Sequence, residues 1–344
     1  MVKKHVRCPK CRSLRTKRNG VRPNQGGLIR RFFCHNCRHS FTGRGSPLPR
    51  LSRRLKVELT RTHLEGRTSI RTLARHTSHS TKTVMKAVHD VTGQCVSAAW
   101  IAEELQPQWG GYLALDGKII RVWEWAAKHF RYTVHQKGWL HKMTMLIALD
   151  LETLDIPIHH LGDEETTIDL VLLLRELKQV NYPLKGYVSD GNEDIKKAVE
   201  LVFGSGIPRQ LCLTHFLRNL RVRLREEKIT ERQYRDAYQA LSTGLKPKLL
   251  RVPDDLFTHR TSPGLPPTNQ QLENLIRYFN LRLKTINQFH DWRTAKDYCN
   301  ALTLMRRFTK FTDCRDQTKN HHAPLELAGV DITNLDYLNL KSNR

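Results

Sequence analysis

The chain has 344 residues, of which 58 are lysine or arginine and 33 are aspartate or glutamate, giving a formal net charge of +25 at pH 7. This length allows two or three domains with a sizeable core, and so basic a surface favours a polyanion such as nucleic acid as partner. No apolar run approaches the roughly eighteen residues of a membrane span and the N-terminus lacks the apolar stretch of a secretory signal, so we expect a cytoplasmic protein with no membrane partner.

Residues 1–45 are predicted to form a zinc ribbon. Two Cys-x-x-Cys pairs, Cys8 with Cys11 and Cys34 with Cys37, are separated by 22 residues. Four thiolates at such spacing suit a tetrahedral structural Zn²⁺, and the metal would stabilise a segment that has few apolar residues of its own. A redox Cys-x-x-Cys is the alternative, but two pairs without a thioredoxin-like strand–helix–strand pattern disfavour it.

The same segment is strongly basic. Residues 1–57 contain 17 lysines or arginines and no acidic residue. We expect this charge to contact DNA phosphates, which gives affinity and salt dependence but little reading of sequence. The candidate phosphate contacts are Arg12, Arg15, Lys17, Arg18, Arg30 and Arg31.

Residues 51–95, after a linker at 43–50 that is rich in glycine and proline, are predicted to form three short helices. Ser80 is the expected N-cap of the third helix, with Val84, Ala87 and Val88 on its buried face. This pattern is typical of a helix-turn-helix DNA-binding domain, and an ordinary helical bundle with a solvated basic face is the alternative. The candidate base-reading residues are Ser80, Thr81, Lys82, Thr83 and Lys86.

Residues 108–310 are predicted to form a mixed α/β domain. Three or four antiparallel strands, among them 130–138, precede alternating helices and strands. The helix within 165–180 is expected to bury Ile168, Leu172 and Leu173. A short helical insertion is expected at about 216–262, and residues 311–344 form a C-terminal tail.

Asp116 is the first candidate catalytic residue. It is followed by Gly117 in the apolar run GYLALDGKIIRV. Asp-Gly between hydrophobic runs is the usual signature of a two-residue hairpin turn. A carboxylate at the end of a rigid strand is also where an enzyme holds a metal ion, and both interpretations stay open from this stretch alone.

Two further acids extend the pattern. Asp190 ends a second apolar strand and is followed by Gly191, and Glu273 lies in the first turns of an amphipathic helix that Asn269 is expected to cap. Taken singly, Asp190 could cap a helix and Glu273 could be a solvated residue near a helix N-terminus. Together, three carboxylates suit two Mg²⁺ or Mn²⁺ ions that promote in-line phosphodiester cleavage.

These motifs resemble those of DDE transposases of the Mutator-like superfamily and their prokaryotic insertion-sequence relatives. The matching segments are LALDG, VSDGNEDIKKAV, QLCLTHFLRNL and PTNQQLENLIRYFNLRLK, and the third carries a Cys-x-x-His pair, Cys212 and His215. The tail HHAPLELAGV is also similar to that of zinc-ribbon transposases.

The resemblance implies an RNase H-like core with Asp116, Asp190 and Glu273 as metal ligands. It further implies cleavage and strand transfer of double-stranded DNA, at transposon ends and target, by a homodimer or larger assembly near the nucleoid of a prokaryote. A DNA-binding regulator without chemistry and a nuclease that cleaves without joining are the alternatives.

Cys212 and His215 stand one helical turn apart and are expected to pack behind the active site in a supporting role. A second zinc is the less favoured interpretation, because the sequence offers no partner pair with metal-ligand spacing.

Overall fold

A computed structural model describes residues 6–24, 27–42, 51–124, 139–226, 230–243, 252–286, 289 and 291–340. The chain forms two compact units, Met1–Ser52 and Arg53–Arg344, each of which is described by itself. The predicted linker at 43–50 and the predicted strand at 130–138 lie outside the described residues.

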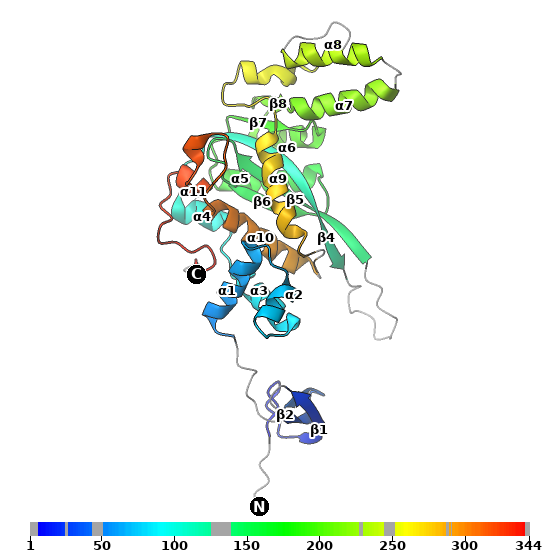
Figure 1. Ribbon diagram of the computed structural model, residues 1–344, viewed down its shortest axis with the longest axis vertical. Coiled ribbons are helices and arrows are strands. Elements are labelled where there is room, and N and C mark those ends of the chain that lie inside the picture. Colours follow the sequence, from blue (N-terminus) through cyan, green and yellow to red (C-terminus); the bar gives the residue numbers. More distant parts are fainter. Residues whose placement is uncertain are drawn as a thin grey trace, which may run out of the picture. The chain divides into compact units, whose positions relative to one another are not determined.

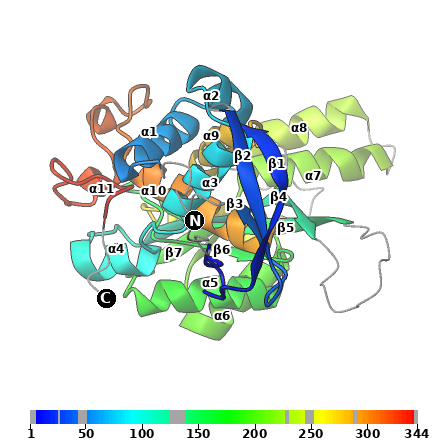
Figure 2. The ribbon, with the colours of Figure 1, turned by 90° about the horizontal axis from the view of Figure 1, so that it is seen from below.

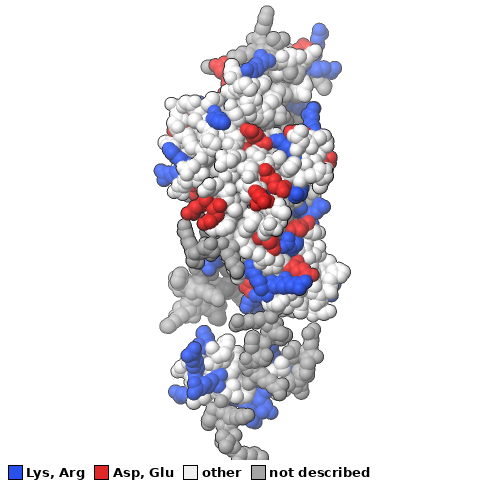
Figure 3. Space-filling view, turned by 90° about the vertical axis from the view of Figure 1, so that its left-hand side faces the viewer, with Lys and Arg blue, Asp and Glu red and all other residues white. Residues whose placement is uncertain are grey.

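The smaller unit contains an antiparallel sheet of three strands, β1 (Thr16–Asn24), β2 (Gly27–Cys34) and β3 (Ser40–Thr42), in the order β1-β2-β3. Phe32 pairs with Phe41, and their rings stack with centroids 5.9 Å apart. This aromatic contact is the main apolar packing that we find in a unit whose visible charges are basic (Figure 3). So small a core needs a further source of stability.

The larger unit begins with helices α1 (Arg53–Leu64), α2 (Ile70–His76) and α3 (Thr81–Thr92), in the region where three helices were predicted. Ser80 caps α3 as expected, accepting a hydrogen bond from the Thr83 N–H at 3.1 Å. Val84, Ala87 and Val88 are buried, also as expected. A fourth helix, α4 (Ala98–Leu105), follows and was not predicted.

The central sheet has five strands in the order β6-β5-β4-β7-β8. Their bounds are β4 (Tyr112–Glu124), β5 (Trp139–Asp150), β6 (Ile158–Gly162), β7 (Gly186–Ser189) and β8 (Arg209–Leu211). The pairs β4–β5 and β5–β6 are antiparallel, whereas β4–β7 and β7–β8 are parallel. The predicted mixed α/β sheet is confirmed.

Asp116 and Gly117 do not end a strand, and they do not form a hairpin turn. Both expectations were wrong, because β4 continues to Glu124 and pairs with β5 along its whole length, with Asp116 opposite Ile147. Beyond Gly117, Ile120 and Val122 are buried at alternate positions. This burial and the continuous ladder hold the Asp-Gly pair extended, although its local preference is for a turn.

Helices cover both faces of the sheet (Figures 1 and 2). Helices α5 (Thr167–Gln179) and α6 (Glu193–Phe203) pack on the face to which Leu113 and Leu115 point. Helices α9 (Gln270–Leu283) and α10 (Trp292–Phe308) pack on the opposite face, with Ala114 and Val188. Successive strand residues face opposite ways, which is why one strand supplies both cores.

The buried face of α5 differs from the prediction. Ile168 and Leu172 are 73% and 41% exposed, whereas Leu173 is buried as expected. The buried stripe is Leu170, Leu173, Leu174 and Leu177, which follows the i, i+3, i+4, i+7 spacing of a helix face. The sequence run LVLLL allowed several stripes, and the docking of α5 on the sheet selected one of them.

Helices α7 (Leu213–Glu226) and α8 (Glu231–Ser242) lie side by side at the β8 edge (Figures 1 and 2). With the 3₁₀ helix η1 (Asp254–Arg260), they enclose a small apolar cluster of their own that includes Leu217, Leu220 and Leu256. This is the region of the predicted short helical insertion. None of the helices in the described ranges is both long and apolar enough to cross a membrane.

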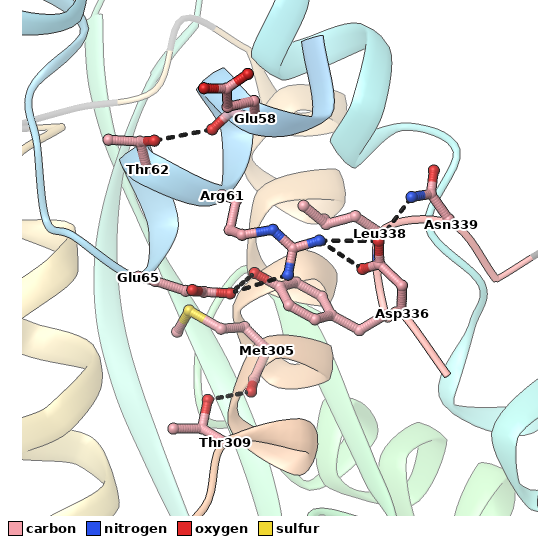
Figure 4. A network of polar contacts seen from close by, with 10 residues as sticks. Glu58, Arg61, Thr62, Glu65, Met305, Thr309, Asp336, Leu338 and Asn339 are labelled. Atoms are coloured by element: carbon pink, nitrogen blue, oxygen red, sulfur yellow. Dashed lines mark hydrogen bonds and ion pairs between the residues drawn. The ribbon is translucent and has the colours of Figure 1, made fainter. Parts of the chain in front are cut away.

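The C-terminal segment packs back on the larger unit through the 3₁₀ helix η2 (Gln317–Lys319), α11 (Pro324–Leu327) and the residues after them. Asp336 accepts two hydrogen bonds of 2.8 Å from the Arg61 guanidinium of α1, and Tyr337 donates one of 2.8 Å to Glu65 (Figure 4). The C-terminal segment therefore binds α1 through these hydrogen bonds.

Candidate active site

Asp116 and Asp190 come from neighbouring parallel strands. Tyr112, Leu113 and Ala114 of β4 pair with Gly186, Tyr187 and Val188 of β7. Asp116 lies two residues beyond Ala114, and Asp190 lies two residues beyond Val188. Because side chains alternate along a strand, Asp116 shares the face of Ala114, where α9 packs, and Asp190 directly follows the end of β7 at about the same level.

Asp116 is a largely buried carboxylate with few partners. Its Oδ1 accepts the Gly117 N–H at 2.7 Å, and the Asn269 amide lies 3.5 Å from its Oδ2. Burial, together with the charges of Asp190 and Glu273, raises the pKa of Asp116 to about 6, although the Gly117 N–H and His215 act in the opposite direction. The charges of the other two predicted acids thus act on Asp116.

Helix α9 brings Glu273 to this group. Leu272, Leu275 and Phe279 are buried against the sheet, so the adjacent Glu273 is held at the margin of the core. Asn269 occupies the N-cap position of α9, as predicted, but its side chain makes no capping hydrogen bond. Its amide instead faces Asp116, and its Oδ1 is buried without a hydrogen-bond partner.

Glu165 is a further carboxylate on which the charges of Asp116 and Asp190 act, and the sequence analysis missed it. It lies in the loop between β6 and α5, and a Cβ atom added at Gly117 would stand 2.9 Å from its Oε2. Burial, followed by the charges of Asp116 and Asp190, raises the pKa of Glu165 to about 7. The sequence signal was the acidic run Asp163–Glu164–Glu165, which is also typical of the approach to a helix N-terminus.

The buried acid Asp150 shows what a structural carboxylate looks like in this protein. Its Oδ1 accepts hydrogen bonds from the N–H and hydroxyl of Thr153, and its Oδ2 accepts them from the Gly111 N–H and the Tyr182 hydroxyl. Four donors satisfy this carboxylate completely. Asp116 and Glu165 are half-buried, with fewer donors and with the charges of other acids acting on them, an arrangement that a bound cation would stabilise.

Cys212 and His215 lie beside the acids. Cys212 directly follows β8, its N–H donates to the Ser189 carbonyl at 2.8 Å, and the Asn269 N–H points at its Sγ at 3.2 Å. His215 is in the first turn of α7, and its Nε2 is 3.6 Å from Oε1 of Glu273. Of the predicted supporting pair, His215 therefore stands next to one of the three predicted acids, and Cys212 lies within 4.8 Å of both.

In the smaller unit, the four predicted cysteines converge. Sγ of Cys8 is 3.5 Å from that of Cys37, and Sγ of Cys11 is 3.6 Å from that of Cys34. Four sulfurs this close, with separations far beyond the roughly 2.05 Å of a disulfide, could bind a metal such as zinc. An arginine of positive φ follows each Cys-x-x-Cys pair, Arg12 after Cys11 and Arg38 after Cys37. The two turns share this backbone feature.

The pKa values of these thiols are also shifted in a way that suits metal binding. A backbone hydrogen bond from Ser13 is the largest of several that lower the pKa of Cys11 to about 6. Burial and the neighbouring sulfurs, by contrast, raise the pKa of Cys37 to about 12. Thiolates crowded together repel one another, and a divalent cation at their centre removes that repulsion.

The candidate DNA contacts are mostly solvent-exposed. Arg12, Arg15, Lys17, Arg18 and Arg30 are exposed and Arg31 is half-buried. On α3, Thr81, Lys82 and Lys86 are exposed, whereas the Ser80 and Thr83 hydroxyls lie 2.8 Å apart and engage each other. The structure leaves the cationic side chains available to a polyanion.

No protein-family model matches this sequence, and no curated protein matches it significantly. The functional assignment therefore depends on the chemistry of the site.

Proposed function

We propose that this protein is a DDE transposase that cleaves and joins DNA at the terminal inverted repeats of an insertion sequence. The observation that carries the proposal is the convergence of Asp116, Asp190 and Glu273 on one face of a mixed sheet. Asp116 and Asp190 come from neighbouring parallel strands in the same register, and Glu273 comes from α9, which packs on that face.

The architecture supports an RNase H-like core. Three antiparallel strands, β6, β5 and β4, are continued by the parallel strands β7 and β8, with helices on both faces. In this sheet β7 pairs with the first three residues of β4, and the last of these pairs, Val188 with Ala114, lies two residues before Asp116. This adjacency would bring an acid from each strand to one place, and α9, which packs across the sheet, would add the third.

The donor set fits hard divalent cations. Asp116, Asp190 and Glu273 would hold two Mg²⁺ or Mn²⁺ ions, which supply an activated water or 3′-hydroxyl and stabilise the leaving oxygen. The raised pKa of Asp116 and the unpartnered buried Oε1 of Glu165 are both relieved by positive charge at this point. The Gly117 N–H, which donates to Asp116 Oδ1, fixes the orientation of that carboxylate.

The remaining modules would deliver DNA to this acidic centre. We propose that the four-cysteine unit is a zinc ribbon and that α1–α3 form a helix-turn-helix, with α3 as the recognition helix. The exposed Lys82 and Lys86 stand on its accessible face, while its apolar face is buried. Phosphate contacts by the basic N-terminal unit would add affinity without specificity.

The test is a cleavage and joining assay on a DNA fragment that carries the gene with both flanks. Purified protein with Mg²⁺ should nick the fragment at its terminal repeats and join the ends to a second duplex. Asp116→Asn and Glu273→Gln should each lower cleavage at least about a hundredfold while DNA binding persists. Glu104→Gln, an exposed acid-to-amide change on α4, is the matched control.

The other outcomes are equally informative. Cleavage without joining would assign a nuclease, and metal-independent binding without cleavage would assign a DNA-binding regulator. Full activity of Asp116→Asn would refute the assignment of the triad.

A further inference from the structure

Cys212 and His215 are the two residues of the site whose chemistry the magnesium mechanism leaves unused. Cys212 is 1% exposed, and His215 is half-buried one turn later along the chain. Thiolate sulfur and imidazole nitrogen are soft and borderline ligands, which Mg²⁺ does not select but Zn²⁺ does. On the sequence alone this pair lacked a third ligand.

Tertiary structure supplies that ligand. One ligand atom each from Cys212, His215 and Glu273 lie within 4.8 Å of one another. His215 Nε2 and Glu273 Oε1 are 3.6 Å apart, which is wider than the 2.7–3.2 Å of a hydrogen bond. Two ligands on a tetrahedral Zn²⁺ with bonds of 2.0–2.1 Å stand about 3.3 Å apart, so the observed gap suits a shared ion better than a direct bond.

The sulfur–sulfur distances of the four-cysteine unit can be compared with ideal zinc geometry in the same way. A tetrahedral ion with Zn–S bonds of 2.3 Å separates its sulfurs by about 3.8 Å. The observed separations are 3.5 and 3.6 Å. The sulfur separations in the four-cysteine unit and the separation of His215 Nε2 from Glu273 Oε1 thus each depart from ideal spacing by only a few tenths of an ångström.

The surroundings of the pair prepare it to bind a cation. The Asn269 N–H donates to Cys212 Sγ at 3.2 Å, as backbone amides do to metal-bound thiolates. His215 Nδ1 is buried without a hydrogen-bond partner.

We propose that Cys212, His215 and Glu273 form a second zinc site with an open fourth position, and that Zn²⁺ bound there inhibits the enzyme. The inhibition rests on the proposed function, because Glu273 is also a ligand of the magnesium pair. A Zn²⁺ ion that binds the Glu273 carboxylate withdraws it from magnesium. On binding, the Cys212 thiol releases its proton to solvent.

Metal binding is tested without reference to activity. The full chain, with one equivalent of Zn²⁺ in the four-cysteine unit, is titrated with Co²⁺, which does not displace zinc readily from thiolates. We expect one further equivalent to bind, with a sulfur-to-cobalt charge-transfer band and visible d–d bands. Cys212→Ser should abolish the charge-transfer band, and Cys314→Ser, a cysteine outside the site, should retain it.

Two other variants guard against a folding artefact at the buried Cys212. His215→Gln and Glu273→Gln should each weaken Co²⁺ binding at least about tenfold, with the circular dichroism and the zinc content of the first unit unchanged. The inference is overturned if the wild-type protein binds no further equivalent, or if Cys212→Ser binds it with the same charge-transfer band.

The inhibitory role is tested in the cleavage assay. Added Zn²⁺ should abolish Mg²⁺-dependent cleavage by the wild type, and the concentration for half-inhibition should rise at least about tenfold in Cys212→Ser, relative to its own zinc-free rate. Cobalt binding without any cleavage would refute the transposase but keep the zinc site. Cleavage with no cobalt site would do the reverse.

Discussion

Asp116 and Asp190 each stand two residues beyond a paired residue, Ala114 and Val188, of the parallel strands β4 and β7. The register of the β4–β7 pair therefore sets the positions of both acids. Asp116 lies within the long strand β4, and Asp190 directly follows the short strand β7. Their repulsion is part of the reason that the pKa of Asp116 is about 6, with burial as the larger cause.

This shift predicts a pH-dependent stability effect in magnesium-free buffer. The folded-state pKa of Asp116, about 6, is above its ordinary value of 3.8, so between these values the folded protein keeps a proton that the unfolded chain has released. The stability contributed by Asp116 is therefore full below pH 3.8, falls as the pH rises to about 6, and stays lowest above that.

Asp116→Asn removes this titration while keeping an acceptor for the Gly117 N–H. Its free energy of unfolding should exceed that of the wild type by about 1–3 kcal/mol at pH 8 and by about zero at pH 4. Urea denaturation at the two pH values measures the difference, and Glu104→Gln should show none. A gain that is equal at both pH values would mean that the charge of Asp116 is not responsible.

Gly117 should not tolerate a side chain. A Cβ at this position would lie 2.7 Å from Cγ2 of Thr144 and 2.9 Å from Oε2 of Glu165. Gly117→Ala should therefore lower the free energy of unfolding by about 1–3 kcal/mol and displace Glu165. Gly206→Ala, where an added Cβ meets nothing within 4 Å, is the matched control in thermal denaturation. Equal melting temperatures for the two variants would contradict the packing.

Loss of one zinc ligand should unfold the smaller unit alone. Cys34→Ser removes one of the four sulfurs, and binding of a structural zinc is worth about 10–16 kcal/mol in small domains. We expect zinc content to fall and the signals of residues 6–42 to collapse in an NMR spectrum, with the melting of the larger unit unchanged. Cys314→Ser should retain the metal, and retention of zinc by Cys34→Ser would be unexpected.

Lys82 should contribute one phosphate contact. It is exposed on the first turn of α3. Lys82→Ala should weaken DNA binding and reduce the slope of log affinity against log salt by about 1. Lys197→Ala on α6 makes the same charge change away from α3, and it should leave the slope as it is. A similar loss in both variants would indicate an effect of net charge only.

The contact between α1 and the C-terminal segment should be measurable as a coupling energy. Arg61 and Asp336 make two hydrogen bonds of 2.8 Å, but their side chains are 39% and 34% exposed, so water screens the pair. A double-mutant cycle with alanine should give about 0.5–1 kcal/mol. The more exposed pair Lys197–Asp194, at 3.8 Å, should give less.

The sequence by itself determined the local features of this protein. Alternating and helical periodicity predicted β5, β7, α3 and α6, because an apolar face must be buried whatever its partner. The spacing of the four cysteines predicted a metal-binding group, because each pair forms its own turn. The two Asp-Gly steps marked Asp116 and Asp190 as unusual charges in apolar surroundings.

Only the tertiary structure decided which residues meet. The long β4–β5 ladder, not the local preference of Asp-Gly, keeps Asp116 extended within a strand. The packing of α5 on the sheet buries Leu170 and Leu174 and leaves Ile168 exposed. The charge of Asp116 acts on Glu165, and Glu273 comes within 3.6 Å of His215, across intervals of chain that carry no periodic signal. Such contacts depend on strand register and helix packing summed over the whole core, and no short stretch of sequence contains that information.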